Sequence, residues 1–307
     1  MNFLASKRSI RISLQTKLIL SLLTVVLVSG LGALLVAKMV INRNIVSQAH
    51  VEVAQKLEVL SEIYSNRLYV KQRLISSLAS YTEFQRNVAN GRRAQIFDAV
   101  QGLKEPSFDF LNVTDAQGKV LVRSRNAQIA DDSVAADKYV RAVLKDKLAV
   151  SGYDVMESSA LAKEGLELVM RAAVPVKSID AEGRRMETQT ETRGMVLKVA
   201  APIWHDGRFV GVIYGALLLN NETAILDRAK NLMLGEEQIN GREVASATLF
   251  MDGLRISTSV RDESGERAVG TQVSQEVYKK VFEEGKVWRD RALVVGHWTI
   301  AAYKPIR

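Results

Sequence analysis

The chain has 307 residues, of which 42 are basic and 34 acidic, a formal net charge of +8, and no cysteine. The absence of cysteine excludes a disulfide scaffold, a thiolate metal site and a cysteine nucleophile. Five of the basic residues flank an apolar segment near the N-terminus, which leaves 37 basic and 34 acidic residues elsewhere. This small excess does not indicate the basic surface that nucleic acid requires, so we expect no nucleic-acid partner.

Residues 18–37, LILSLLTVVLVSGLGALLVA, form an uninterrupted apolar run without a charged side chain. About 20 helical residues, at about 1.5 Å each, span the roughly 30 Å hydrocarbon core of a bilayer. Four basic residues precede the run and the first acidic residue is Glu52, so the positive-inside rule places the N-terminus in the cytoplasm. We predict a cytoplasmic N-terminus over 1–17, a transmembrane helix over 18–40, and an extracytoplasmic chain beyond it.

A cleavable signal peptide is the alternative interpretation of this segment. Its apolar region would span about 7–15 residues and end at a small-x-small cleavage site. Here the run is longer, and residues 38–41, KMVI, follow it without such a site. We therefore expect an uncleaved anchor, and both interpretations export the rest of the chain.

The segment from about 42 to 103 lacks proline, and its apolar residues recur at helical spacing. We predict a long helix over 41–104 that continues out of the membrane. It is either an amphipathic helix packed on its own domain or the stalk of a dimer, which would need a heptad pattern over three to four repeats. Both can hold over different stretches.

After Pro106 the pattern changes from helical to stranded. Residues 108–124 contain two β-rich runs around a turn at 115–118, which predicts a hairpin. The elements expected next are a polar helix from 137 to about 149, a strand over 166–176, an exposed polar excursion over 177–194, and two strands over 195–219.

The order then repeats in shorter form after a helical segment over 222–234. The expected elements are two strands over 244–260, a short helix over 274–284, and two strands over 291–306. Helices combined with antiparallel strands indicate the α+β class. We predict two tandem PAS-like modules with antiparallel sheets, over 105–221 and 222–307.

Four segments carry a resemblance to a known family: LNVTDAQGKVLVRS (111–124), AAPIWHDGRFVGVIYGALLL (200–219), TLFMDGLRISTSV (248–260) and the stretch from ERAVGT to AAYKPI (266–306). They resemble the extracytoplasmic Cache modules of bacterial receptors, loosely over 105–220 and closely from 246 onward. The later part is similar to the membrane-proximal module of double Cache sensors, so the resemblance implies a ligand-sensing ectodomain of a histidine kinase, a chemoreceptor or a diguanylate cyclase.

In that family a closing strand, a second transmembrane helix and a cytoplasmic output domain follow the second module. We therefore expect 222–307 to be a truncated module, and the gene product to continue past Arg307 into a transmitter, with a histidine kinase favoured. The closing strand would pair an apolar sheet edge that is otherwise left open.

Catalytic motifs are not visible in this chain. It has no phosphate-binding loop, nucleophile elbow or zinc-protease helix, and each of its three histidines, His50, His205 and His297, stands alone in the sequence. A metal site needs three or four convergent ligands. We expect no enzyme activity, no metal and no cofactor.

Binding is the remaining function, and the candidate ligand-binding residues are Arg123, Arg125, Tyr139, Tyr153, Arg171 and Lys198. Arg123 and Arg125 alternate along one predicted strand, and Arg171 and Lys198 interrupt apolar strands. Such a cation pairs with a partner, faces solvent or meets an anionic ligand. A solvated sheet face is the ordinary interpretation, because Arg and Lys are rarely buried unless paired.

The leading hypothesis is a membrane-anchored, homodimeric sensor of a small molecule, an anionic one among the candidates, in a bacterial inner membrane with most of the chain periplasmic. The rival is a non-sensory periplasmic module that holds a partner protein. The resemblance also implies a role in holding the fold for Arg255, Arg267, Thr271, Trp288 and Trp298.

Overall fold

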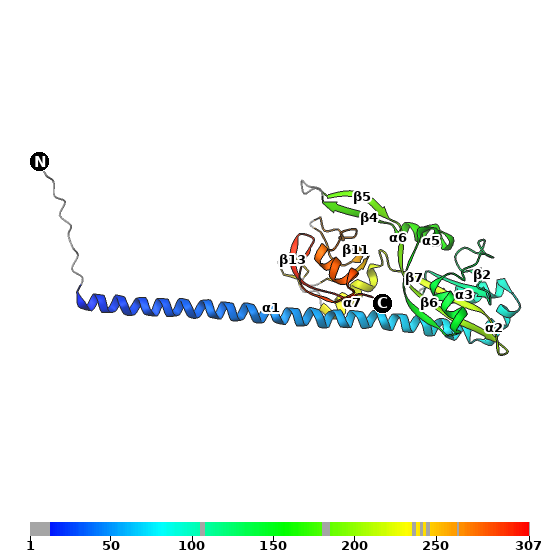
Figure 1. The fold of residues 1–307 in the computed structure, drawn as a ribbon, viewed down its shortest axis with the longest axis horizontal. Helices are drawn as coiled ribbons and strands as arrows, with labels where there is room; N and C mark the ends of the chain where they lie inside the picture. Colours follow the sequence, from blue (N-terminus) through cyan, green and yellow to red (C-terminus); the bar gives the residue numbers. More distant parts are fainter. Residues whose placement is uncertain are drawn as a thin grey trace. The chain divides into compact units, whose positions relative to one another are not determined.

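The computed structural model describes residues 13–104, 108–179, 185–234, 238–239, 242–243, 246–262 and 264–306. The chain divides into two compact units, Met1–Glu52 and Val53–Arg307. Figure 1 shows the elements of both units.

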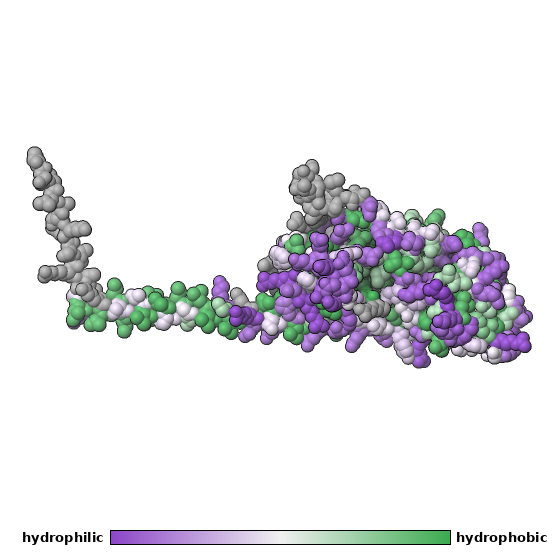
Figure 2. Space-filling model, viewed as in Figure 1, coloured by the Kyte–Doolittle hydropathy of each residue, from purple (hydrophilic) through white to green (hydrophobic). Residues whose placement is uncertain are grey.

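The first unit contains the beginning of α1 (Leu14–Ala79), which is the single helix of the described chain that is long and apolar enough to cross a membrane. Its most apolar window has a mean hydropathy of 2.6, and none of that window is buried. Figure 2 shows this part of α1 as an almost continuous apolar surface. The predicted transmembrane segment therefore lies within one uninterrupted helix whose apolar side chains face outward.

The predicted helix over 41–104 is wrong beyond Ala79, where α1 ends. Two shorter helices follow, α2 (Thr82–Ala89) and α3 (Arg93–Lys104). Gly91, with φ of +64°, takes the left-handed conformation that stops α2. The breaks allow Phe84 of α2 and Ile96 of α3 to bury in the same core as Ile75 of α1. One straight helix could not direct all three side chains into that core.

The second unit is built on a five-stranded antiparallel sheet with the order β2-β1-β7-β6-β3. Its strands are β1 (Phe110–Asp115), β2 (Val120–Arg123), β3 (Val150–Met156), β6 (Gly194–His205) and β7 (Arg208–Leu218). The hairpins predicted around 115–118 and 205–207 are confirmed. Gly118 closes the first turn with φ of +82°, which an L side chain rarely adopts.

Each face of this sheet has its own core. One core joins the sheet to α1, α2 and α3, and the other joins it to α4 (Lys138–Asp146), α5 (Ser158–Glu164) and α6 (Leu166–Ala172). The strand predicted over 166–176 is wrong in its first part, which is α6. Leu168 and Ala172, four residues apart, bury on one side of this helix, and Pro175 follows once the chain is extended.

The polar segment predicted as an excursion between strands forms a two-stranded hairpin, β4 (Val174–Ile179) with β5 (Arg185–Glu191). The amide of Lys177 donates a hydrogen bond to the carbonyl of Gly270 at 2.8 Å. The hairpin is thus joined to the C-terminal part of the unit.

The C-terminal part contains the hairpins β10 (Thr248–Met251) with β11 (Leu254–Thr258) and β12 (Trp288–Val294) with β13 (His297–Tyr303), as well as the short antiparallel pair of β8 (Gln238–Ile239) and β9 (Arg242–Glu243). Its other elements are α7 (Thr223–Leu234), α8 (Gln275–Tyr278) and the π-helical turn η1 (Lys279–Glu283). The predicted α+β class is confirmed. The module boundary near residue 221 stays a prediction, because both sides of it belong to one compact unit.

Candidate ligand-binding site

The α4–α6 face of the five-stranded sheet carries a group of charged side chains that we call the polar cluster. It comprises Arg123, Lys198, Asp132, Asp137, Asp154 and Glu164. The strand register brings the sheet residues together, because Asn112 of β1 lies opposite both Arg123 of β2 and Tyr214 of β7. Directly opposed residues of antiparallel strands share one face.

Arg123 is the most enclosed cation of the polar cluster, at 1% exposure. Its Nη1 and Nη2 donate to the two carboxylate oxygens of Asp132 at 2.6 and 3.1 Å, Nη1 also donates to the carbonyl of Ile129 at 2.8 Å, and Nε donates to Glu164 at 3.1 Å. The guanidinium lowers the pKa of Asp132 to about 2. Internal acceptors thus take four of the five N–H groups of the Arg123 guanidinium.

Glu164, at the end of α5, is 4% exposed. Burial raises the pKa of its carboxyl group, and hydrogen bonds from Asn112 and Arg123 partly oppose this effect. Asn112 Nδ2 donates to Glu164 Oε2 at 2.8 Å and to the hydroxyl of Tyr214 at 3.1 Å. These bonds link α5 to three neighbouring strands.

Lys198 of β6 is 3% exposed and forms an ion pair with Asp137, while Asp154 lies at 3.9 Å. Asp137 also caps α4, because its Oδ1 accepts hydrogen bonds from the amides of Tyr139 and Val140, both at 3.1 Å. One carboxylate therefore fixes the start of α4 over the sheet and neutralises a buried ammonium group.

Tyr139 lies at the edge of the polar cluster, and its hydroxyl donates a hydrogen bond to the carbonyl of Tyr153 at 2.8 Å. This contact requires a glycine opposite, since a Cβ on Gly152 would come within 2.5 Å of the Tyr139 hydroxyl. The side chain of Tyr153 itself packs against the core on the opposite face of the sheet, and burial raises its pKa to about 12.

The two remaining candidates, Arg125 and Arg171, converge on Asp109 just before β1. Arg125 donates to the Asp109 carbonyl at 3.1 Å and pairs with Glu167, and Arg171 donates to Asp109 Oδ2 at 2.5 Å. The same oxygen of Asp109 accepts from the amide of Leu218 at 2.6 Å. This second group ties α6 to the end of the sheet.

The structure therefore brings Arg123, Tyr139 and Lys198 together, places Arg125 and Arg171 in a separate group, and turns the Tyr153 side chain away. The solvated sheet face is contradicted for Arg123 and Lys198, which are buried and paired. Arg171 lies on a helix and not on a strand. Ligand binding by any of the six residues stays a prediction.

The partner carboxylates were not identified from the sequence. Asp132 lies in a loop and Glu164 in a seven-residue helix, so neither follows a strand or long-helix pattern. Asn112 and Asp137 carried a usable signal: a polar residue inside an apolar strand, and an N-cap residue before a helix.

In the C-terminal part, two residues implied by the resemblance hold the fold as expected. Arg267 donates to both carboxylate oxygens of Asp227 on α7, at 3.0 and 2.6 Å, and Thr271 donates to the carbonyl of Ala268 at 3.0 Å. Trp298 was expected to do the same but is 73% exposed, on the outer side of β13 opposite the exposed Leu293.

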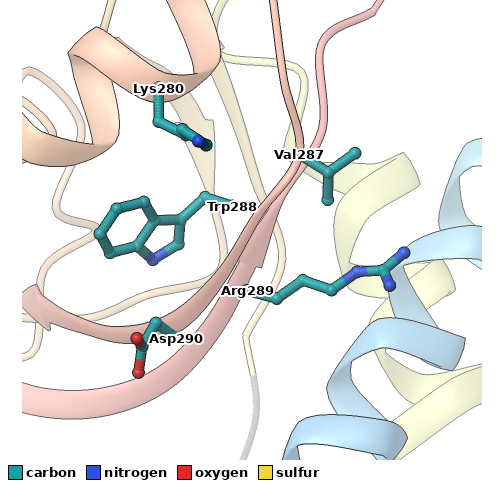
Figure 3. Close-up of a pocket in the computed structure, with 5 residues that line it drawn as sticks. All are labelled: Lys280, Val287, Trp288, Arg289 and Asp290. Atoms are coloured by element: carbon teal, nitrogen blue, oxygen red, sulfur yellow. The ribbon is translucent and has the colours of Figure 1, made fainter.

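A pocket of about 440 Å³ also lies in this part, lined by Lys280, Val287, Trp288, Arg289 and Asp290 (Figure 3). Lys280 and Trp288 extend to one side of the strand and Arg289 to the other. Arg289 is directed toward α1, where its Nη2 lies 3.9 Å from Glu58.

In the described segments of the chain, no three side chains among His, Cys, Asp and Glu lie in an arrangement that could hold a metal ion. The acidic side chains of the polar cluster are instead directed at Arg123, Lys163 and Lys198.

Comparison with solved structures finds distant resemblances to sensor domains. The periplasmic domain of Vibrio cholerae LuxQ has 13% identity, a TM-score of 0.42, and coverage of 81% of this chain and 96% of that one. The sensory domain of the Campylobacter jejuni chemoreceptor Tlp3 has 10% identity, a TM-score of 0.44, and coverage of 85% and 89%. The extracellular domain of the putative histidine kinase rpHK1S-Z16 has 12% identity, a TM-score of 0.44, and coverage of 81% and 84%.

Comparison with curated proteins gives no match. Residues 217–307 match the family described as Single cache domain 3, and the assignment rests on this sequence match. The matched range contains the segments whose motifs resemble Cache modules most closely. The C-terminal part of this chain, residues 217–307, therefore matches a Cache domain family.

Proposed function

We propose that this protein is a membrane-anchored receptor whose extracytoplasmic part binds a small molecule at the polar cluster of the five-stranded sheet. The observation that carries the proposal is the concentration of buried charge on one sheet face, under α4 and α5. Burying several charges is costly unless each is paired. A site that pairs them internally can exchange those pairs for the charges of a ligand.

The balance of charge suggests which ligand fits. The polar cluster together with Lys163 at its rim contains four carboxylates and three cations. A purely anionic ligand, the class considered from the sequence, would add to this negative excess. A molecule that carries both a carboxylate and an ammonium group can pair with Arg123 and with the surplus carboxylates together. We propose a small zwitterion of this kind.

Asp137→Asn tests the site without removing the cap of α4, because Asn caps helices as well as Asp does. The matched control is Asp206→Asn, at an exposed turn where φ is +47° and Asn is tolerated. The assay is calorimetry and thermal shift of the full chain in detergent, with the twenty common amino acids and the same acids lacking the amino group.

We expect an amino acid to bind, its deaminated counterpart to bind weakly, and Asp137→Asn to lose roughly 10- to 150-fold in affinity, the range for a hydrogen bond to a charged group. Asp206→Asn should bind as the parent does. If no compound of either series raises the unfolding temperature, the proposal fails and the rival function, a module that holds a partner protein, is favoured.

We also propose that α1 carries the signal toward the membrane. α1 contributes Tyr64, Ile75 and Ala79 to the core beneath the sheet, so a shift of the sheet on ligand binding would move the helix that leads to the membrane. We propose a periplasmic ectodomain of a bacterial inner-membrane receptor, as input to a histidine kinase, chemoreceptor or cyclase.

A homodimer through α1 is part of the same proposal. Val59 and Val70 are exposed apolar residues eleven positions apart, about three turns, and so share one side of the helix. Cross-linking of cysteines introduced at positions 59 and 70 should give dimers in membranes. A strictly monomeric product at both positions would refute the dimer.

A further inference from the structure

The β12–β13 hairpin has two faces of different character. Directly opposed residues of antiparallel strands share a face, so the register of this pair assigns every side chain to one side or the other. The inner face contains the buried Ala292, which packs in one cluster with Val277 of α8. The outer face contains Arg291 and Leu293 of β12 and Trp298 of β13. The core of the C-terminal part therefore lies against only one side of the hairpin.

The outer face exposes an apolar pair. Leu293 is 50% and Trp298 73% exposed, and the two residues lie directly opposite each other. Neither belongs to a hydrophobic cluster of the part of the chain that the structure describes. A tryptophan contributes a large apolar surface, and an exposed apolar patch of this kind marks an interaction site.

A cation without a partner lies beside this apolar pair. Arg291 is exposed, two positions before Leu293 on the same face. Its backbone amide donates to Asp290, but its guanidinium makes no hydrogen bond or ion pair with the described residues. Tryptophan rings favour the headgroup layer of a bilayer, apolar side chains favour the acyl boundary, and guanidinium groups bind lipid phosphate. The outer face combines all three preferences.

The hairpin also belongs to the end of the second unit at which α1 enters it (Figure 1). Lys304, directly after β13, pairs with Glu58 of α1 at 2.6 Å, whereas Ile75 and Ala79, further along α1, pack beneath the five-stranded sheet. About 18 helical residues, about 27 Å, separate Glu58 from the end of the predicted span at residue 40. The seven residues of β13 extend about 23 Å, so the hairpin is long enough to reach the headgroup layer.

We propose that the outer face of the β12–β13 hairpin docks on the bilayer that α1 crosses, with Leu293 and Trp298 at the headgroup boundary and Arg291 on the phosphate of an anionic lipid. This inference rests on the membrane anchor of the proposed function and does not involve the polar cluster. Two apolar side chains and one cation are too few to recruit a soluble protein to a membrane. The anchor makes the contact effectively intramolecular, so a weak contact is sufficient.

The experiment uses the absence of cysteine from the chain, because one introduced cysteine then gives a single labelled position. His297→Cys, next to Trp298, carries an environment-sensitive fluorophore, and the matched control is Arg92→Cys in the exposed loop between α2 and α3. The full chain is reconstituted in nanodiscs of phosphatidylcholine, with or without phosphatidylglycerol. Lipids with a nitroxide on the headgroup are the quencher, and co-elution with nanodiscs at high salt reports the anchor separately.

The label at position 297 should be quenched at least twofold more than the label at position 92. Leu293→Ser and Trp298→Ser should each reduce this quenching, and the double variant should abolish it without changing the unfolding temperature. Arg291→Gln should lower the ratio of docked to undocked hairpin roughly fivefold in nanodiscs that contain phosphatidylglycerol, and should have little effect in phosphatidylcholine alone.

The contrary outcomes separate this inference from the anchor on which it rests. A chain that does not co-elute with nanodiscs would overturn both. Co-elution without quenching at position 297 would overturn the docking alone, and so would quenching that the double variant leaves unchanged. A blue-shifted label that nitroxide lipids do not quench would assign the outer face to a protein partner, such as a second copy of the chain, and would overturn the docking as well.

Discussion

Replacing Arg123 by Met should destabilise the protein strongly, because Arg123 is the cation that compensates the buried Glu164. Arg123 is 1% and Glu164 4% exposed, and the pair is joined at 3.1 Å. The substitution keeps most of the side-chain volume but leaves Glu164 without its counter-ion. It also removes three further hydrogen bonds, to Asp132 and to the carbonyl of Ile129.

Removal of one partner from a buried ion pair costs about 3–5 kcal/mol. For a folded unit of this size, that corresponds to a fall in the unfolding temperature of roughly 6–20 °C. The measurement is thermal or urea unfolding of the full chain, with Glu164→Gln and the double variant as companions. The double variant should lose less than Arg123→Met alone, since no uncompensated charge remains, and the coupling should lie near 0.5–3 kcal/mol.

The pH dependence has a definite sign. Burial already raises the pKa of Glu164, and loss of the guanidinium raises it further. An acid whose pKa is raised on folding contributes most stability below its unfolded pKa, about 4.3, and loses that contribution as pH rises through the folded value. Arg123→Met should therefore be least destabilised near pH 5 and most near pH 8. A loss below about 1 kcal/mol at pH 8, or a loss that does not change with pH, would refute the buried pairing.

Gly152→Ala should lower the free energy of unfolding by about 1–3 kcal/mol, because its Cβ would lie 2.5 Å from the hydroxyl of Tyr139. Gly102→Ala, at a helical position with open space around it, should be neutral or stabilising by up to about 1 kcal/mol. Equal unfolding temperatures of the two variants would contradict the close contact. Asp132, whose pKa is lowered to about 2, should contribute stability that is present above pH 4 and lost as pH falls toward 2, and Asp132→Asn should remove that part of the acid titration. Trp298→Ala should change the free energy of unfolding by no more than about 0.5 kcal/mol, because the side chain is 73% exposed; a loss above 2 kcal/mol in urea unfolding would show that Trp298 packs in the folded protein.

Much of the fold follows from local patterns in the sequence. Glycine-containing turns at 115–118, 205–207 and 252–253 lie between alternating apolar residues, and each forms the hairpin that this pattern predicts. The apolar run from 18 to 37 lies within one helix for the same reason, since twenty apolar residues without a helix breaker leave few other structures. Local conformational preference and hydrophobic period depend on consecutive residues, so both can be predicted from the sequence.

Local patterns failed where long-range packing decides the structure. Leu166–Ala172 is apolar enough for a strand, yet it is a helix because Leu168 and Ala172 pack on the sheet at helical spacing. The helix predicted to reach residue 104 breaks near 80 and 90, where the short helices turn to bury Phe84 and Ile96. Neither the helix at Leu166–Ala172 nor the breaks near residues 80 and 90 can be predicted without knowing the surface on which these side chains pack.

The candidate site shows the same division. The sequence by itself determined that Arg123 and Lys198 lie on strands, that residues 18–37 are helical, and that residues 217–307 match a Cache domain family. Only the tertiary structure decided that Arg123 and Lys198 are buried, that Glu164 and Asp137 are their partners, and that Trp298 is exposed. The partners of Arg123 and Lys198 lie 41 and 61 residues away along the chain. Charge pairing depends on distance in space, and no local pattern of residues encodes that distance.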